Sequence, residues 1–115
     1  MNYDLEEQTA KFGENVIHFV STLTKNEVNK ILINQIVRSA TSVWANYMEA
    51  NQASSKKDFK NKINICRKEA NETKYWMRMI SSANKDKTDE CKPLLEEANE
   101  LLLIFSKIFS SSSRD

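Results

Sequence analysis

The chain has 115 residues with a formal net charge of +1, and it contains one glycine and one proline. This length suits a single domain, and the scarcity of glycine and proline argues against a sheet-rich fold and against a glycine-rich phosphate loop. A nearly neutral chain also lacks the field of a general polyanion binder, so any nucleic-acid surface must be local.

Targeting and metal-binding signals are missing from the sequence. The N-terminal residues show no basic region followed by an apolar run, and no apolar stretch reaches the roughly 18 residues of a membrane span. Cys66 and Cys91 form no CxxC motif, and His18 is the sole histidine, which argues against zinc and against a disulfide framework. We therefore expect a cytoplasmic protein with no membrane span, no cofactor and no small-molecule substrate.

The first predicted helix covers roughly residues 5–23, where apolar side chains recur at alternating spacings of four and three. Thr9 fills the one gap in this series, and Gly13 marks either a close helix approach or a tolerated weak point. The apolar members are Leu5, Phe12, Val16, Phe19 and Leu23.

The second predicted helix starts near Lys25 and runs to about Ala50. Thr24 and Glu27 have the spacing of a capping box, which predicts this start. One side of the helix is apolar and should face the bundle: Leu32, Ile33, Ile36, Ala40, Val43, Trp44, Tyr47 and Ala50. The opposite side carries Gln35, Arg38, Ser39, Ser42, Asn46 and Glu49, together with Ile31.

This opposite side is almost free of charge, since Arg38 and Glu49 are the only charged residues from Ile31 to Ser55. Short hydrogen-bonding side chains in place of Lys and Glu indicate packed contact instead of a solvated face. Arg38 and Glu49 lie about 16 Å apart along a helix and cannot pair with each other. We expect a mostly buried Arg38 guanidinium that pairs with Glu69 and Glu72 as a structural ion pair, since no nucleophile or histidine base accompanies it for catalysis.

The third predicted helix is the most regular, with Ser55 and Asp58 as capping residues. Its seam is Phe59, Ile63, Cys66, Ala70, Thr73, Met77 and Ile80. Cys66 on this seam should be an inert core thiol. Ile65, Trp76 and Met79 lie on a different face, which predicts either a partner site or an isolated exposed tryptophan.

A basic stripe follows a further side of the third helix: Lys56, Lys60, Arg67, Lys74 and Arg78. Acidic residues gather instead in residues 1–15 and 86–100. The stripe predicts a site that aligns subunits head to tail or recruits a phosphate backbone, with a merely solvated face as the plain alternative.

The fourth predicted helix begins at Asp89 or Glu90, with Pro93 in its first turn, where a missing N–H does least damage. Its seam is Leu94, Ala98, Leu101, Phe105 and Ile108. Residues 111–115 should form a frayed tail. Four helices joined by short polar loops predict an all-α fold, an antiparallel up-down-up-down four-helix bundle in one domain, residues 1–110.

The middle of the chain resembles the four-helix bundle family of 23S rRNA intervening-sequence, or ribosomal-S23-like, proteins. The matching elements are Gln35, the run Arg38 to Ser42, Asn46, Glu49-Ala50, the run Ser55 to Phe59, Glu69, Glu72 and Tyr75-Trp76. Ala50 departs from the pattern, since many relatives have glycine there. The resemblance implies a bundle that assembles as a ring-like homopentamer without catalytic residues.

The resemblance also implies two settings for such a protein. Some relatives are encoded in intervening sequences of bacterial 23S rRNA genes, and others are accessory proteins of diversity-generating retroelements that engage a reverse transcriptase and nucleic acid. We therefore predict a non-enzymatic homo-oligomeric scaffold or accessory protein. The rival hypothesis is an RNA- or DNA-binding module that uses the basic stripe.

Overall fold

The computed structural model describes residues 2–112 and the side chains of residues 5–112. The described chain forms four α-helices and one short 3-10 turn, with no strand among residues 2–112. The helices are α1 (Asn2–Val20), α2 (Glu27–Asn51), α3 (Lys56–Ala83) and α4 (Thr88–Ser112), and the 3-10 turn η1 (Lys85–Lys87) precedes α4. The all-α prediction is confirmed.

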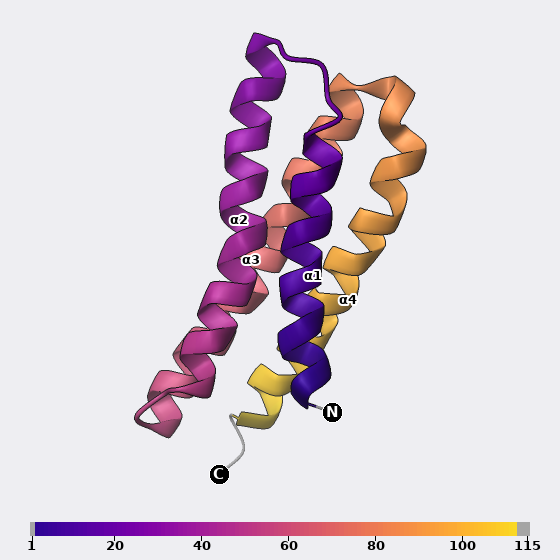
Figure 1. The fold of residues 1–115 in the computed structure, drawn as a ribbon. Coiled ribbons are helices and arrows are strands. Elements are labelled where there is room, and N and C mark those ends of the chain that lie inside the picture. Colours follow the sequence, from indigo (N-terminus) through magenta and orange to yellow (C-terminus); the bar gives the residue numbers. More distant parts are fainter. Residues whose placement is uncertain (1, 113–115) are drawn as a thin grey trace.

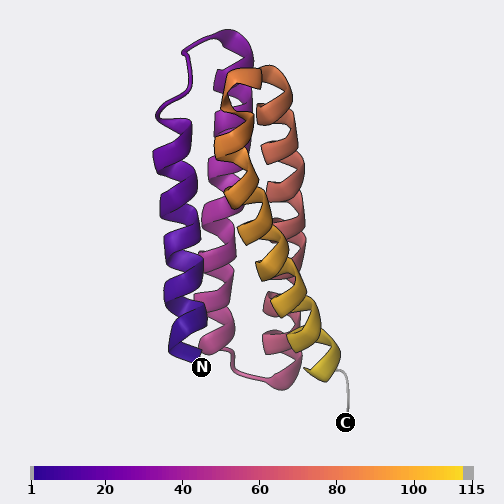
Figure 2. The same cartoon turned by 90° about the vertical axis from the view of Figure 1, so that its right-hand side faces the viewer.

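The helices pack side by side into a rod that measures 48 × 21 × 20 Å. Figure 1 shows the α1–α2 and α3–α4 connections at one end of the rod, and the α2–α3 connection at the other end with both termini. Helix α3 packs against α2 and α4, and α1 packs against the same two helices from the other side. Figure 2 shows α4 inclined to the other helices, and α1 contacts α4 less than it contacts α2.

The core is built from the predicted seams. All six positions of the first seam, including Thr9, are buried, as are Ile63, Cys66 and Met77 of the third. Thr9 is accommodated there because its hydroxyl donates to the Leu5 carbonyl at 2.9 Å. Burial of each large apolar side chain contributes about 1.5–3 kcal/mol before chain entropy is subtracted, so these seams hold the rod together.

The residues that cap the starts of α2 and α3 can be compared with the predicted caps. Ser55 caps α3 as expected, since its hydroxyl accepts a hydrogen bond from the Asp58 amide at 3.0 Å. The predicted capping box at Thr24 is wrong, because Asn26 is the cap of α2 and accepts from the Asn29 amide at 2.8 Å. Asparagine is at least as strong an N-cap as threonine, and the cap of α2 therefore lies at Asn26 and not at the predicted Thr24.

The last helix also departs from the prediction at both ends. It begins at Thr88, so Asp89 and Glu90 lie in its first turn instead of at the cap, and Pro93 lies in the second turn. At the other end α4 continues through Ser112, so residues 111 and 112 are helical and do not belong to a frayed tail. The rest of the predicted tail, residues 113–115, lies outside the described residues.

Candidate functional site

The outer surface shared by α2 and α3 carries the residues that the sequence singled out for assembly. We call it the assembly face and define it by Ile31, Arg38, Ser42, Asn46 and Glu49 of α2 and by Glu69, Glu72 and Trp76 of α3. All eight positions were singled out in the sequence, and the two helices that carry them pack against each other.

Arg38 crosses from α2 to both predicted acids on α3. Its Nη1 lies 3.3 Å from Glu69 Oε1, and its Nη2 contacts Glu72 Oε2. Glu72 in turn accepts a hydrogen bond from Trp76 Nε1 at 2.8 Å. The Trp76 ring also meets Tyr75 edge-on, with ring centres 4.8 Å apart. One carboxylate therefore holds the guanidinium and the indole in fixed positions.

The guanidinium is less buried than the sequence suggested. In the single chain the Arg38 side chain is 46% exposed, and Glu72 is 38% exposed. The prediction of a mostly buried Arg38 is wrong for one chain, because the long side chain lies over the outside of α3 instead of entering the core. An ion pair this exposed contributes about 1 kcal/mol at most.

The small polar residues of α2 bond to their own helix. Ser42 Oγ donates to the Arg38 carbonyl at 2.7 Å, and Asn46 Nδ2 donates to the Ser42 carbonyl at 2.9 Å. Both side chains are half-buried. Farther along, Lys62 Nζ of α3 lies 2.7 Å from Glu49 Oε1, so the second charge of this helix side is paired as well. The polar groups of the assembly face are therefore largely satisfied within the single chain.

Two predicted positions on α2 lie elsewhere. Ser39 was assigned to the outer side, but it is fully buried and accepts a hydrogen bond from the Thr73 hydroxyl of α3 at 2.8 Å. Trp44 was assigned to the bundle face, but it is 41% exposed. A helical wheel gives the direction of a side chain and not the position of the neighbouring helix, and both residues lie at the border between faces.

The basic stripe of α3 runs along its contact with α4. Lys60 and Arg67 lie over the Phe109 ring, at 5.0 and 4.5 Å from its centre. Lys74 Nζ donates to Asn99 Oδ1 of α4 at 2.8 Å. These three cations therefore support the α3–α4 contact, which the prediction of a wholly solvated or ligand-facing stripe did not include. Arg78 is exposed, and Lys56, also exposed, lies at the start of α3.

A buried pair of asparagine amides, not predicted from the sequence, lies at the end of the rod that holds the α1–α2 and α3–α4 connections (Figure 1). Asn29 of α2 and Asn84, after α3, exchange hydrogen bonds of 3.0 and 2.9 Å, and Asn29 also donates to the Thr24 carbonyl at 2.7 Å. Asn29 is 1% exposed and lies two turns before the core residue Ile36 on the same stripe. In the sequence, Asn29 is a polar residue on the apolar stripe of the second helix, and this position was the feature that could have predicted a buried amide.

The thiols are poor nucleophiles. Burial raises the pKa of the Cys66 thiol to about 12, and its Sγ lies 3.6 Å from the Val43 carbonyl oxygen. Burial also raises the pKa of Cys91. Among the described side chains, no group of three or more His, Cys, Asp or Glu residues is arranged to hold a metal ion. None of the helices between residues 2 and 112 has the length and apolar character needed to cross a lipid bilayer.

Comparison with known proteins agrees with this architecture. A solved structure from Bacteroides thetaiotaomicron, described as a protein of unknown function from the S23 ribosomal protein family, is 30% identical, with a TM-score of 0.81. The match covers 90% of this chain and 96% of that one. No curated protein matches the chain. The family model for the 23S rRNA-intervening sequence protein matches residues 2–107. The chain therefore belongs to the 23S rRNA-intervening sequence protein family.

Proposed function

We propose that this protein is a non-enzymatic scaffold that assembles with copies of itself through the assembly face. The observation that carries the proposal is that both charges on the α2 side of this face are paired within one chain. Arg38 is balanced by Glu69 and Glu72, and Glu49 is balanced by Lys62. Because Arg38 and Glu49 already have partners of opposite charge within one chain, a second chain can cover the α2 side without burying an unpaired charge of that helix.

Apolar exposure on the same helix supports the proposal. Ile31 is 62% exposed and Val28 is 56% exposed, on the outer side of α2. Trp76 and Arg38 belong to residue types that are enriched in interfaces, and the glutamate between them fixes both side chains in advance. Pre-ordered side chains lose less conformational entropy on association, which favours a stable assembly.

We propose a ring of five chains as the assembled form, following the family resemblance. The resemblance also implies a reverse transcriptase as a partner, and this stays a prediction without a residue assigned to it. A non-enzymatic role accords with the raised pKa values of both thiols, which remove the most nucleophilic side chains from use at neutral pH.

The test compares two substitutions of equal chemistry on different faces. Ile31 and Leu103 are each 62% exposed in the single chain, but Leu103 lies on α4, away from the assembly face. Ile31→Lys should release monomers in sedimentation velocity at micromolar concentration, because it would bury an unpaired charge between chains. Leu103→Lys should leave the assembly intact. Equal sedimentation of the two variants would count against the assembly face.

Nucleic-acid binding by the basic stripe is a second candidate. The observation in its favour is the placement of Lys60, Arg67, Lys74 and Arg78 on the side of α3 that faces α4, which concentrates positive charge on a chain of almost no net charge. Filter binding over a salt series tests it: phosphate contacts predict log affinity falling by about 0.7–0.9 per contact against log salt. Reversal of Lys60, Arg67 and Lys74 to Glu should then abolish binding. No binding at low salt would retire this candidate.

A further inference from the structure

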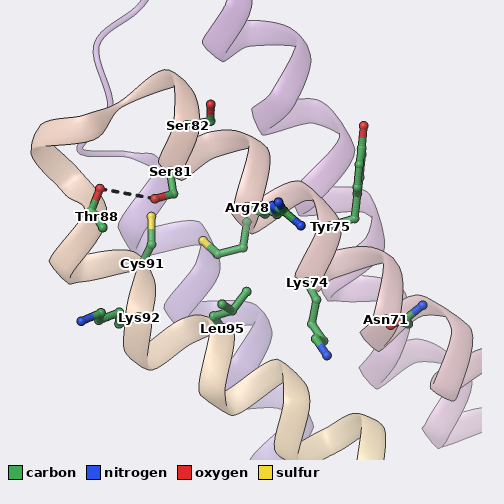
Figure 3. A pocket seen from close by; sticks show the side chains of 11 residues that line it. Asn71, Lys74, Tyr75, Arg78, Ser81, Ser82, Thr88, Cys91, Lys92 and Leu95 are labelled. Carbon is green, nitrogen blue, oxygen red and sulfur yellow. Dashed lines mark hydrogen bonds between the residues drawn. The ribbon is translucent and has the colours of Figure 1, made fainter.

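A cavity of about 700 Å³ opens between the C-terminal half of α3 and the N-terminal half of α4. It lies on the α4 side of α3, so it is separate from the assembly face. Figure 3 shows Lys74, Tyr75 and Arg78 extending from α3 and Cys91 and Leu95 from α4. The volume falls within the range of about 300–1,000 Å³ that is typical of small-molecule sites.

The floor of the cavity is apolar. Met77 and Cys91 are 1% and 4% exposed, and Leu95, at 37%, extends the apolar surface outward. Tyr75 is 52% exposed, so its ring is available beside the cavity while its other contacts are with Trp76. A molecule with a flat apolar body would cover this floor and gain the free energy of removing apolar surface from water.

The charges around the cavity all have one sign. Lys74, Arg78 and Lys92 contribute cations, and none of the described residues that line the cavity is acidic. The Arg78 guanidinium has no acidic partner among the described side chains, in contrast to Arg38. Lys74 uses one of its three donors on Asn99, at 2.8 Å, and keeps two for another acceptor.

Two acids of α4 contact residues away from the cavity. Glu97 accepts a hydrogen bond from Asn15 of α1 at 3.5 Å, and Glu90 is 3.6 Å from Lys87 Nζ. These two carboxylates are therefore turned toward α1 and toward η1, and no acidic side chain between residues 5 and 112 lines the cavity beside Lys74 and Arg78. An unpaired guanidinium with its fork of donors favours a planar carboxylate, a sulfonate or a phosphate.

From this combination we infer that the α3–α4 cavity binds a small aromatic anion, with its ring on the floor made by Met77, Cys91 and Leu95 and its charged group at Arg78 and Lys74. The inference does not depend on the proposed assembly. Nothing in the binding of such an anion requires a second chain, since both walls and both cations come from one bundle.

Fluorescence titration of the full chain with anilinonaphthalene sulfonate tests the inference, because this aromatic sulfonate brightens in apolar surroundings. We expect saturable binding of one probe per chain. Arg78→Glu should weaken binding at least about tenfold, the loss expected for a charge-assisted hydrogen bond. Leu95→Glu, which places an acid on the floor, should abolish it. Lys11→Glu, with the same charge reversal on an exposed residue of α1, should bind as the unmodified chain does.

Competition identifies the anionic group. Displacement of the probe by naphthoate or by naphthyl phosphate supports the inference, and the stronger competitor shows whether the site prefers a carboxylate or a phosphate. Equal displacement by neutral naphthyl methanol would overturn it, as would equal affinity of the Arg78→Glu and Lys11→Glu variants. Helicity and sedimentation of each variant are measured alongside, so loss of the site is distinguished from loss of fold or assembly.

Discussion

Gly13 lies where α1 packs on α2, and the structure decides between the two roles that the sequence left open. A Cβ atom at this position would lie 3.8 Å from the Ala40 carbonyl oxygen and 3.8 Å from Thr41 Cγ2. Both distances are ordinary van der Waals contact. The close packing of the helices therefore does not require glycine, and Gly13 is a tolerated weak point.

Gly13→Ala should stabilise the protein. Alanine loses less backbone entropy on helix formation than glycine, and its methyl group fills the space beside α2, so we expect a gain of about 0.5–1 kcal/mol in the free energy of unfolding. Urea denaturation followed by circular dichroism measures it. Ala10→Gly in the same helix is the matched control and should lose a similar amount. A Gly13→Ala variant less stable than the parent chain would show that α1 and α2 approach more closely than described.

Burial of the Cys66 thiol should make the protein less stable at alkaline pH. Its pKa is about 12 in the folded chain against an ordinary value of 9.0, so the unfolded thiol loses its proton first as the pH rises. Between these two values the native state binds more protons than the unfolded state, and the free energy of unfolding must fall. Below pH 9.0 the contribution is constant. In a series of urea denaturations, Cys66→Ala should show a shallower decline over this range, and equal slopes would contradict the burial of the thiol.

At the scale of helices, the sequence pattern predicted the centre of each buried stripe better than the residues at its edges. The four-three spacing found the seams because a helix buries one stripe whatever its neighbours are. Ser39 and Trp44 lie at the edges of the α2 stripe, where burial depends on the position of the adjacent helix. The basic stripe was found, but its contacts with Phe109 and Asn99 were not, because periodicity within one helix does not record which side chain a second helix brings opposite.

The amide pair Asn29–Asn84 connects the start of α2 to the end of α3. Replacing Asn84 with Ala leaves the buried Asn29 amide without one partner, which should cost about 1–3 kcal/mol of unfolding free energy. Asn29→Ala should cost a similar amount, and the double variant should cost less than the two single losses added together. Thermal or urea denaturation of the four proteins gives the coupling. Strict additivity would show that the two amides do not depend on each other.

The coupling free energy between Arg38 of α2 and Glu72 of α3 should differ between a single chain and an assembly. In the single chain Arg38 is 46% exposed, so a cycle of Arg38→Met and Glu72→Gln should give a coupling below about 1 kcal/mol. Covering by a second chain removes water from the pair and should raise the coupling. Measuring the cycle in the parent chain and again with Ile31→Lys separates the two states. The same coupling in both would argue that the pair stays in water.

At the scale of the whole molecule, the rod divides its surface by chemistry. One side, the assembly face, has paired charges and exposed apolar residues of α2. Another, along α3 and α4, collects unpaired positive charge around a cavity. Fold and family were accessible from the sequence because residues 35–80 contain both the strongest seam and the family pattern. The cavity could not be predicted from the sequence, because it forms only when α3 and α4 pack together and its lining residues belong to different stripes of these helices.

If copies of this chain cover the outer side of α2, as we propose, the protein in solution is larger than one chain. Light scattering coupled to size exclusion, on the unmodified protein at micromolar concentration, measures the mass directly. We expect a single species of five times the 13.3 kDa of one chain. A stable, fully helical species of 13.3 kDa would contradict it, because Ile31 and the half-buried polar residues of α2 would then face water with no chain to cover them.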